Sequence, residues 1–294
     1  MAVSVRGYHN EPGYSADFMR VYDFLARLNR STVITPHYLW ARWVWQFGPY
    51  MNMEHLARIG IFEENGGMVG LATYENDLGE AYLCLDEGVP DLAFRAVGYA
   101  LEHLRKDGRI RISLPDGALK LQQAAVSWGL HATGEKSSVA RLDIGELDYR
   151  LPPGYRIMDF ADPDFDADRY YDAIWKGFDN RRARNERERQ SMEAREGFDA
   201  PGFENSLKVL VVSPSGDYAA HCGIWHLPGS EYAYIEPVFT LPEYRRKGLG
   251  RAAVWEAARR CGGRGAKYAL VVSDQPFYYG IGFYPIQNET WWEK

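Results

Sequence analysis

The chain has 294 residues, of which 46% are hydrophobic and 25% charged, enough apolar material for one large or two ordinary domains. Its net charge of −6 argues against general nucleic-acid binding and is compatible with a cationic substrate. No run of 18 apolar residues occurs and the first seven residues lack a signal-peptide core, so we expect a cytoplasmic protein without a membrane span.

The first half of the sequence alternates strand and helix patterns. Glu64-Asn65-Gly66-Gly67 is typical of a hairpin turn. The predicted elements are strands at 3–8, 58–63, 68–74, 81–85, 109–114 and 137–144, and helices at 15–29, 36–46, 91–106 and 118–128.

Leu151-Pro152-Pro153-Gly154 interrupts this pattern, and we interpret it as a linker. A second series follows, with strands at 155–160, 208–213, 218–226, 232–240 and 269–272, and helices at 166–178, 180–195 and 251–260. Five arginines between 181 and 189 alternate with glutamates, which predicts a solvated helix, with a lid over a cleft as the alternative.

The two halves resemble a tandem repeat. Gly70 and Gly223 lie at matching places in the predicted hairpins, 153 positions apart (223 − 70), and Gly129 and Gly282 have the same separation (282 − 129). We therefore expect domains at 1–147 and 148–294.

The sequence offers no metal site. Cys84, Cys222 and Cys261 are scattered and form no metal-type pair, so we expect reduced thiols. Four aspartates between 162 and 168 lack the glycine and terminal glutamate of a calcium loop, and they predict a turn and a helix N-terminus.

A strand, a basic glycine turn and a helix follow one another between 232 and 260. A helix that begins after such a turn presents unpaired N–H groups and the positive end of its dipole, an arrangement that binds phosphate. Gly248 and Gly250 would allow close approach to the backbone, and Arg245, Arg246 and Lys247 add positive charge.

Two motifs here resemble those of the GNAT superfamily of N-acetyltransferases. Arg-x-x-Gly-x-Gly at 245–250 resembles its acetyl-CoA loop, and the segment from Ser273 to Phe283 resembles its closing motif, a short helix with a tyrosine that ends in Gly-Phe. The resemblance covers residues 150–294 directly. It implies two tandem α/β domains, each with a mixed, mostly antiparallel sheet flanked by helices.

The resemblance also implies where the cofactor acetyl-CoA binds. The pantetheine arm would pair with an open strand at Val238, Phe239 and Thr240, and Pro237, which has no N–H, suits a strand that cannot pair continuously. The pyrophosphate would lie on Arg245, Arg246, Lys247, Gly248, Leu249, Gly250 and Arg251.

Candidate acid and base follow from the same resemblance. Tyr278, five residues before Phe283, is the expected acid that protonates the CoA thiolate, with Tyr279 as the alternative register. Glu236 shares a strand face with Val238 and Thr240 and is the candidate base through a water, or else a structural carboxylate. His221 and His226 are weaker candidates.

The predicted function is acetyl transfer from acetyl-CoA to the amine of a small molecule, by direct attack of the amine. The alternatives are a non-catalytic acyl-CoA sensor or scaffold and a protein-modifying acetyltransferase. With the 153-residue offset, Arg245, Gly248 and Gly250 fall on Leu92, Arg95 and Val97, so the first half would be a degenerate domain that packs, shapes the cleft or forms a homodimer.

Overall fold

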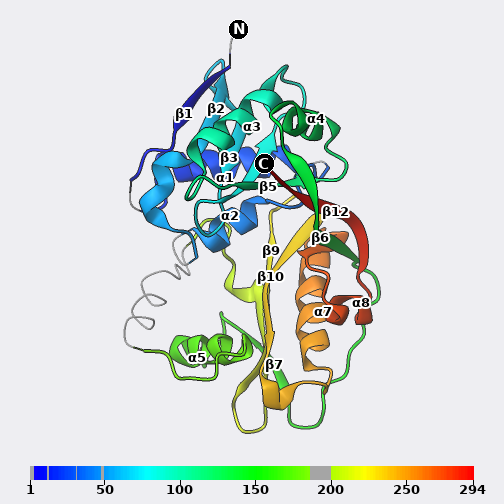
Figure 1. The fold of residues 1–294 in the computed structure, drawn as a ribbon. Coiled ribbons are helices and arrows are strands. Elements are labelled where there is room, and N and C mark those ends of the chain that lie inside the picture. The colour runs from blue at the N-terminus through cyan, green and yellow to red at the C-terminus, as the bar shows by residue number, and fades with distance from the viewer. Residues whose placement is uncertain (1–2, 12, 31, 48–49, 186–199) are drawn as a thin grey trace. The chain divides into compact units, whose positions relative to one another are not determined.

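The computed structural model describes residues 3–11, 13–30, 32–47, 50–185 and 200–294 (Figure 1). The chain divides into unit 1, formed by Met1–Ala140, Val272–Gln275 and Pro285–Lys294, and unit 2, formed by Arg141–Val271 and Pro276–Tyr284. The last ten residues thus lie in unit 1, although the expected linear division at residue 147 assigns them to the second half. The assignment of separate roles to the two halves stays a prediction.

Unit 1 contains a mixed sheet in the order β1-β2-β3-β4-β5-β12-β6. The strands β4 and β5 are parallel, and the β1–β2, β2–β3, β3–β4 and β5–β12 pairs are antiparallel. The strands are β1 (Ser4–Gly7), β2 (Gly60–Glu64), β3 (Gly67–Thr73), β4 (Glu80–Leu85), β5 (Arg111–Pro115), β6 (His131–Asp143) and β12 (Tyr284–Glu293), and the helices are α1 (Ala16–Leu28), α2 (Trp40–Gln46), η1 (Met53–Arg58), α3 (Leu92–His103) and α4 (Leu119–Ser127).

Unit 2 contains a sheet in the order β11-β10-β9-β8-β7. Only its β10–β11 pair is parallel among the pairs described. The strands are β7 (Arg156–Asp159), β8 (Lys208–Val212), β9 (Tyr218–His226), β10 (Tyr232–Thr240) and β11 (Tyr268–Val272), and the helices are α5 (Ala167–Gly177), η2 (Asn205–Leu207), η3 (Pro242–Tyr244), α7 (Leu249–Gly262) and α8 (Pro276–Gly280).

This architecture confirms the predicted mixed α/β class with mostly antiparallel sheets. The hairpin turn between β2 and β3 is also confirmed, with Asn65 at φ 53° and Gly66 at φ 78°, the left-handed conformation such turns require. Asp166 caps α5 by accepting from the Arg169 N–H, as the run of aspartates predicted.

Several predicted elements were wrong in extent. The helix predicted at 36–46 begins only at Trp40, and the final strand β12 was not predicted. Residues 180–185 of the helix predicted at 180–195 are not helical, and 186–199 lie outside the described residues. Gly248 in the left-handed conformation starts α7 two residues earlier than predicted.

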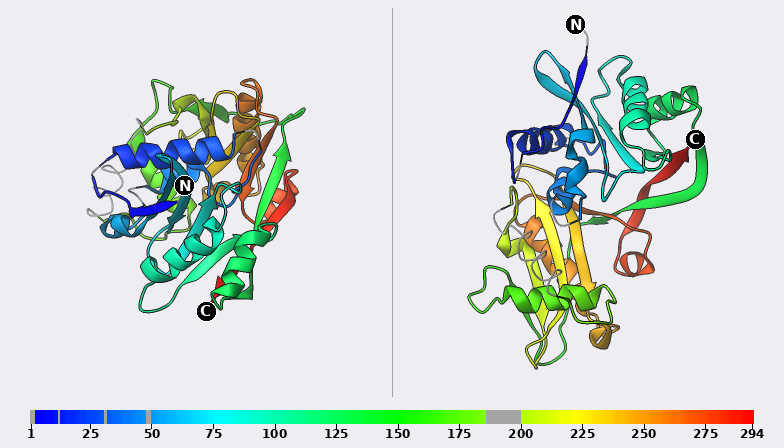
Figure 2. Two further views of the ribbon diagram at one scale, coloured as in Figure 1. Left: turned by 90° about the horizontal axis from the view of Figure 1, so that it is seen from above. Right: turned by 60° about the vertical axis from the view of Figure 1, so that its left-hand side comes forward.

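Helices cover both faces of the unit 2 sheet (Figure 2). Successive side chains of a strand point to opposite faces. His221 of β9 packs its ring on Tyr170 of α5, with centroids 5.1 Å apart, whereas its neighbour Cys222 lies on the face that Cys261 of α7 approaches. The sheet is therefore buried between α5 and α7.

The repeat is visible in both units, but its offset is not constant. The helices α3 and α7 begin 157 positions apart (249 − 92), as do β5 and β11 (268 − 111), because β10 and the connection after it (232–248) are together longer than β4 and its connection (80–91). Asp91, at φ 56°, caps α3 where Gly248, at φ 77°, caps α7. The predicted match of Gly248 with Arg95 was therefore wrong, and its counterpart is Asp91.

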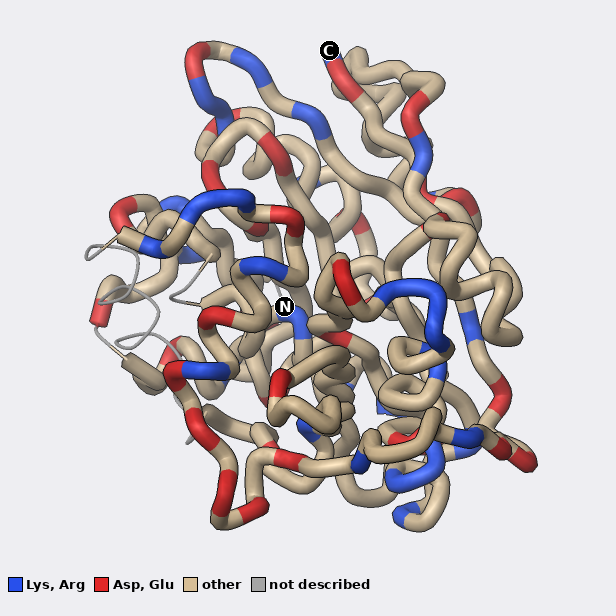
Figure 3. Tube along the Cα trace, turned by 90° about the horizontal axis from the view of Figure 1, so that it is seen from below, with Lys and Arg blue, Asp and Glu red and all other residues tan. Residues whose placement is uncertain are grey.

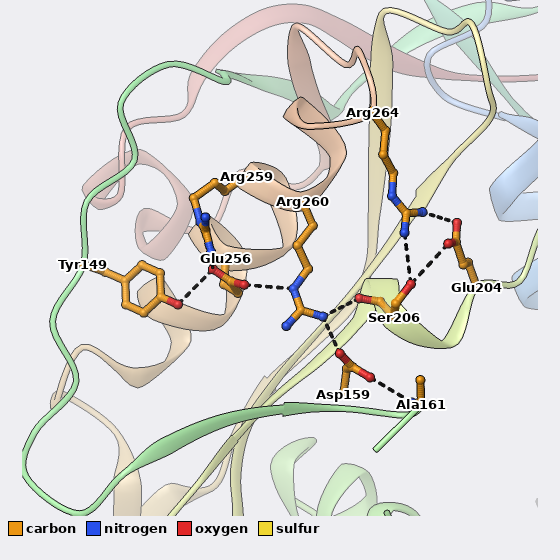
Figure 4. Close-up of polar contacts among 9 residues, drawn as sticks. All are labelled: Tyr149, Asp159, Ala161, Glu204, Ser206, Glu256, Arg259, Arg260 and Arg264. Carbon is orange, nitrogen blue, oxygen red and sulfur yellow. Dashed lines mark hydrogen bonds and ion pairs between the residues drawn. The ribbon is translucent and has the colours of Figure 1, made fainter. Parts of the chain in front are cut away.

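A polar network fixes the C-terminal half of α7 within unit 2 (Figure 4). Arg260 donates to Asp159 of β7 at 2.5 Å, to the Ser206 carbonyl at 2.6 Å and to Glu256 at 2.9 Å. Tyr149, from the segment that precedes β7, donates to the other Glu256 oxygen at 2.9 Å. Because these bonds are charge-assisted and half-buried, they hold the edge strand β7 and the linker against the helix.

Unit 1 buries an ionisable pair around its C-terminal strand. Ser113 of β5 donates to Glu289 Oε2 of β12 at 3.3 Å, and His37 Nδ1 lies 3.9 Å from Glu289 Oε1. Burial raises the pKa of Glu289 to about 7 and lowers the pKa of His37 to about 3. Burial therefore favours the neutral form of both side chains.

Glu289 should make stability depend on pH. Its pKa is about 7 in the folded chain and 4.5 ordinarily, so the folded state holds a proton that the unfolded state has lost in this range. The free energy of unfolding should therefore fall as pH rises from about 4.5 to 7, by roughly 1.4 kcal/mol per pH unit at most. Urea unfolding of Glu289→Gln should lack this fall, and the exposed Glu293→Gln should retain it. An equal fall in both variants would contradict the prediction.

Candidate active site

The central feature of unit 2 is the separation of two parallel strands. β10 pairs with β11 only from Tyr232–Tyr268 to Tyr234–Leu270, although β10 continues along β9 to Thr240. Its register on β9 shifts between Ile235 and Val238, the place where Pro237 predicted interrupted pairing. Beyond Tyr234 the β11 side of β10 offers backbone groups with which an extended molecule could pair.

The basic turn leads from this strand into α7. Arg246 at φ 63° and Gly248 at φ 77° are both left-handed, and Gly248 caps the helix. A Cβ on Gly248 would meet only the Arg251 side chain, at 3.8 Å, so this side of the cap is open. The first N–H groups of a 14-residue helix thus face an accessible turn, which suits an anion.

The two glycines of the turn have different structural roles. A Cβ on Gly250 would lie 2.8 Å from Thr240 Oγ1 and 3.2 Å from the Phe277 ring. The missing side chain therefore lets α7 pack against β10 and α8. The exposed position is that of Gly248.

The cations of the turn also differ in their contacts. Arg245 donates to the Thr240 carbonyl at 3.0 Å, the Gly177 carbonyl at 3.1 Å and Asp179 at 2.9 Å. It therefore ties the turn to the end of α5. Lys247 lies 4.9 Å from the Tyr244 ring and Arg251 5.1 Å from the Trp255 ring, and both side chains are exposed.

Side chains of β10 after the register shift alternate in exposure. Glu236, Val238 and Thr240 are half-buried, whereas the Phe239 ring is buried with its centroid 5.4 Å from that of His221. Of the three predicted pantetheine contacts, Phe239 can therefore contribute its backbone but not its ring.

Hydrogen bonds from side chains of β9 and β10 hold Glu236. Its carboxylate Oε2 accepts a hydrogen bond from Tyr234 Oη at 2.8 Å, and its carbonyl accepts one from Trp225 Nε1 of β9 at 2.8 Å. Gly223 makes room for that carbonyl, because a Cβ there would lie 2.6 Å from the Glu236 oxygen. A half-buried carboxylate so fixed can accept a proton at a defined place.

Tyr278 and Tyr279 occupy contrasting environments on α8. Tyr278 is 8% exposed and packs edge-on against Phe283, with ring centroids 5.4 Å apart, whereas Tyr279 is 37% exposed. Burial raises the pKa of Tyr278, and the nearby Cys222 and Glu236 raise it further. The charge of Glu236 thus acts on the buried Tyr278.

The two histidines have structural surroundings. His221 is buried between Phe160, Tyr170 and Phe239, and burial, with the charge of Lys208, lowers its pKa to about 3. His226 Nε2 contacts the Ser230 carbonyl at 3.0 Å within the β9–β10 turn. Neither ring lies at the separation of β10 and β11.

Comparison with known proteins identifies the part of unit 2 that contains this site. Residues 167–284 match the Acetyltransferase (GNAT) family. These residues form a GNAT domain. No curated protein sequence is similar enough to match the chain.

Solved structures share the fold of the whole chain. A tandem GNAT protein from the clavulanic acid biosynthesis pathway has a TM-score of 0.61 and 13% identity over 100% of this chain and 98% of its own. A GCN5-related N-acetyltransferase from Sphaerobacter thermophilus has a TM-score of 0.57 and 15% identity, with 99% and 95% covered. A GNAT-family acetyltransferase from Colwellia psychrerythraea has a TM-score of 0.58 and 12% identity, with 100% and 99% covered. The chain thus has the fold of a tandem GNAT protein.

The GNAT domain carries no other conspicuous binding feature in its described part. Among the residues that the structure describes, no group of His, Cys, Asp and Glu could hold a metal ion, and no helix is long and apolar enough to cross a membrane. Acidic and basic segments are interspersed along the chain in the view of Figure 3.

Sequence reasoning missed one unusual residue of the GNAT domain. Lys208 of β8 is buried, donates to the Ile224 carbonyl at 3.1 Å and places Nζ 3.4 Å from the centroid of the Trp225 ring. Burial lowers the pKa of Lys208 to about 7. Its strand composition is otherwise apolar, so only the isolated lysine in Lys-Val-Leu-Val-Val could have signalled it.

Lys208 should impose a second pH dependence on stability. The unfolded chain binds a proton on this amine up to its ordinary pKa of 10.5, whereas the folded chain releases it near 7. The free energy of unfolding should therefore rise as pH increases from about 7 towards 10. Guanidinium unfolding of Lys208→Met should show a smaller rise than wild type, and the exposed Lys176→Met serves as the control. A rise that persists unchanged in Lys208→Met would refute this.

Proposed function

We propose that the chain is an acetyl-CoA-dependent N-acetyltransferase whose acceptor is the amine of a small molecule. The observation that carries the proposal is the junction of three features in the GNAT domain. The open side of β10 and the start of α7 could hold an extended phosphorylated cofactor, and Glu236, close to the point where β10 leaves β11, raises the pKa of Tyr278.

The residues of the site fit acetyl-CoA. The N–H groups of Leu249, Gly250 and Arg251, with the positive end of the α7 dipole, would hold the pyrophosphate, and Arg246 and Lys247 would add charge. Arg245 would support the turn through Asp179. The backbone of Val238 and Thr240 would pair with the pantetheine arm. When bound, acetyl-CoA supplies an activated acetyl thioester.

Glu236 and Tyr278 divide the proton transfers between them. Glu236 accepts the proton that the acceptor ammonium must lose, directly or through a water, so that the nitrogen lone pair can attack. Tyr278 donates its phenolic proton to the departing sulfur. Because the pKa of Tyr278 is raised, its hydroxyl is protonated throughout the neutral range and the donor is always present.

Two other functions compete with this one. A non-catalytic acyl-CoA sensor or scaffold would bind the cofactor at the same turn but would not need Tyr278 and Glu236 in electrostatic contact, which favours the enzyme. A protein-modifying acetyltransferase would need an open acceptor groove. A screen of amines, amino acids, aminoglycosides and peptides for acetyl transfer separates these functions.

We further propose that unit 1 is a degenerate GNAT-like domain that binds no acetyl-CoA, and that it packs, shapes the cleft or supports a homodimer. Asp91 places a carboxylate at the start of α3, where α7 has Gly248. An anion at that position would meet a like charge.

The cap of α7 can be tested by replacing Gly248 with aspartate, the residue that caps α3 in unit 1. Gly248→Asp should keep the left-handed cap, since Asp91 adopts it, but should repel the pyrophosphate. Acetyl-CoA affinity should fall at least about tenfold, or roughly 1.4 kcal/mol. Titration calorimetry should also give one site per chain in wild type.

Gly248→Asn is the matched control, because it keeps the shape of the aspartate without its charge. Its affinity should stay close to that of wild type. Unchanged binding in a folded Gly248→Asp, or two equivalent sites per chain, would argue against this site.

The acid can be tested with Tyr278→Phe, which removes one hydroxyl and keeps the buried ring. With an acceptor from the screen, kcat should drop by roughly 10²-fold, while acetyl-CoA affinity should change little because the proton is needed only in the transition state. Stopped assays of acetyl transfer and calorimetry measure the two quantities. Tyr279→Phe is the control, and full activity in both single variants and the double variant would exclude a tyrosine acid.

A further inference from the structure

Glu236 lies in the least regular part of β10. The register of β10 on β9 shifts between Ile235 and Val238, and the described pairing with β11 ends at Tyr234. Regular ladder bonds, which fix most strand residues, are therefore interrupted around this carboxylate. Side chains from β9 and β10 reach it.

The backbone of Glu236 is fixed from β9. Trp225 Nε1 donates to the Glu236 carbonyl at 2.8 Å, and the indole is 2% exposed. Lys208 Nζ lies 3.4 Å from the centroid of this ring, and the Phe203 ring packs edge-on at 5.5 Å. Because the indole is buried and packs against both side chains, its N–H points in a set direction.

The side chain of Glu236 is fixed from its own strand. Tyr234 Oη donates to Glu236 Oε2 at 2.8 Å, a distance typical of a good hydrogen bond. The Tyr234 ring is itself 2% exposed, so its hydroxyl has little freedom to turn away. A phenol that donates to a carboxylate stabilises the ionised form, because the bond is stronger to a charged acceptor.

We propose that Tyr234 is a positioning residue that holds the Glu236 carboxylate ionised and oriented for the acceptor amine. This rests on the proposed function, in which Glu236 accepts the proton of the ammonium. Tyr234 itself need not touch either substrate. Without its hydroxyl, the carboxylate should be protonated at higher pH and should occupy a wider range of orientations.

The test is Tyr234→Phe, with Tyr232→Phe as the matched control. Tyr232 lies two residues earlier on β10, is 3% exposed, and stacks on Tyr268 with ring centroids 6.4 Å apart. Each substitution removes one phenolic oxygen from the same strand. Thermal unfolding of both variants verifies that the fold is kept.

Two readouts distinguish positioning from packing. Carbon-13 NMR of glutamate carboxyls, assigned with Glu236→Gln, should show the Glu236 titration in Tyr234→Phe at a pH about one unit higher than in wild type. The acidic limb of the kcat/KM profile, measured with an acceptor from the amine screen, should move by the same amount, while acetyl-CoA affinity is unchanged. Tyr232→Phe should leave both readouts at their wild-type positions.

The outcomes separate this inference from the proposed function. A Glu236 titration that is the same in Tyr234→Phe and wild type would overturn the positioning role, even if acetyl transfer is observed. A shifted titration in a protein that transfers acetyl to none of the amines would support the hydrogen bond and its effect, and would overturn the catalytic function of the site. Equal shifts in Tyr234→Phe and Tyr232→Phe would mean a general loss of packing and would also reject the role.

Discussion

β10 pairs with β9 along most of its length but with β11 over three residues only, and this unequal pairing determines the layout of the GNAT domain. A strand freed on one side exposes backbone donors and acceptors that must be satisfied by another molecule or by water. After β10, the connection at 241–248 leads into α7, whose first N–H groups face that turn. Strand opening and helix start therefore follow one another along the chain.

Burial of charge marks both units, with opposite effects. Glu289 in unit 1 holds a proton more tightly than in water, and Lys208 in unit 2 holds one less tightly, because a low-dielectric interior disfavours either charge. Lys208 is compensated by a carbonyl and the face of Trp225, the residue whose indole N–H holds the Glu236 backbone. The buried Lys208 amine therefore contacts Trp225, and the Trp225 indole in turn holds the backbone of Glu236, the proposed base.

Local patterns in the sequence predicted the elements that local physics determines. The Asn65-Gly66 turn, the Asp166 cap and the glycine start of α7 all follow from backbone conformations that few residues adopt. β12 was missed because its partner β5 lies far away in the sequence and β12 carries no periodic signal, with Glu289 buried and Ile286 exposed. The uniform repeat offset failed because β10 and its connection are longer than β4 and its connection, which a comparison of two glycine pairs cannot detect.

The site was predictable only in part, because several of its contacts depend on how the chain packs. The resemblance to the GNAT closing motif nominated Tyr278 and the strand pattern nominated Glu236, but only the packing of the fold shows the closeness of Gly250 to Thr240 and the bond from Arg245 to Asp179. Neither Tyr234 nor Trp225 had a sequence signal, since aromatic residues on strands are ordinarily core residues. The Trp225 bond to Glu236 joins two strands, whereas the Tyr234 bond joins residues two apart on one strand.

The two helix starts show how such a fold can lose a site without losing its shape. Asp91 and Gly248 have the same left-handed backbone and each begins a long helix behind the parallel strand pair of its unit. Aspartate tolerates this conformation better than most residues with a side chain, so replacing glycine there costs little stability. The added carboxylate nevertheless opposes an anion at the helix N-terminus, where a dipole of fixed direction would otherwise attract it. An aspartate at such a cap would therefore oppose phosphate binding while the strands and helices of the unit continue to pack.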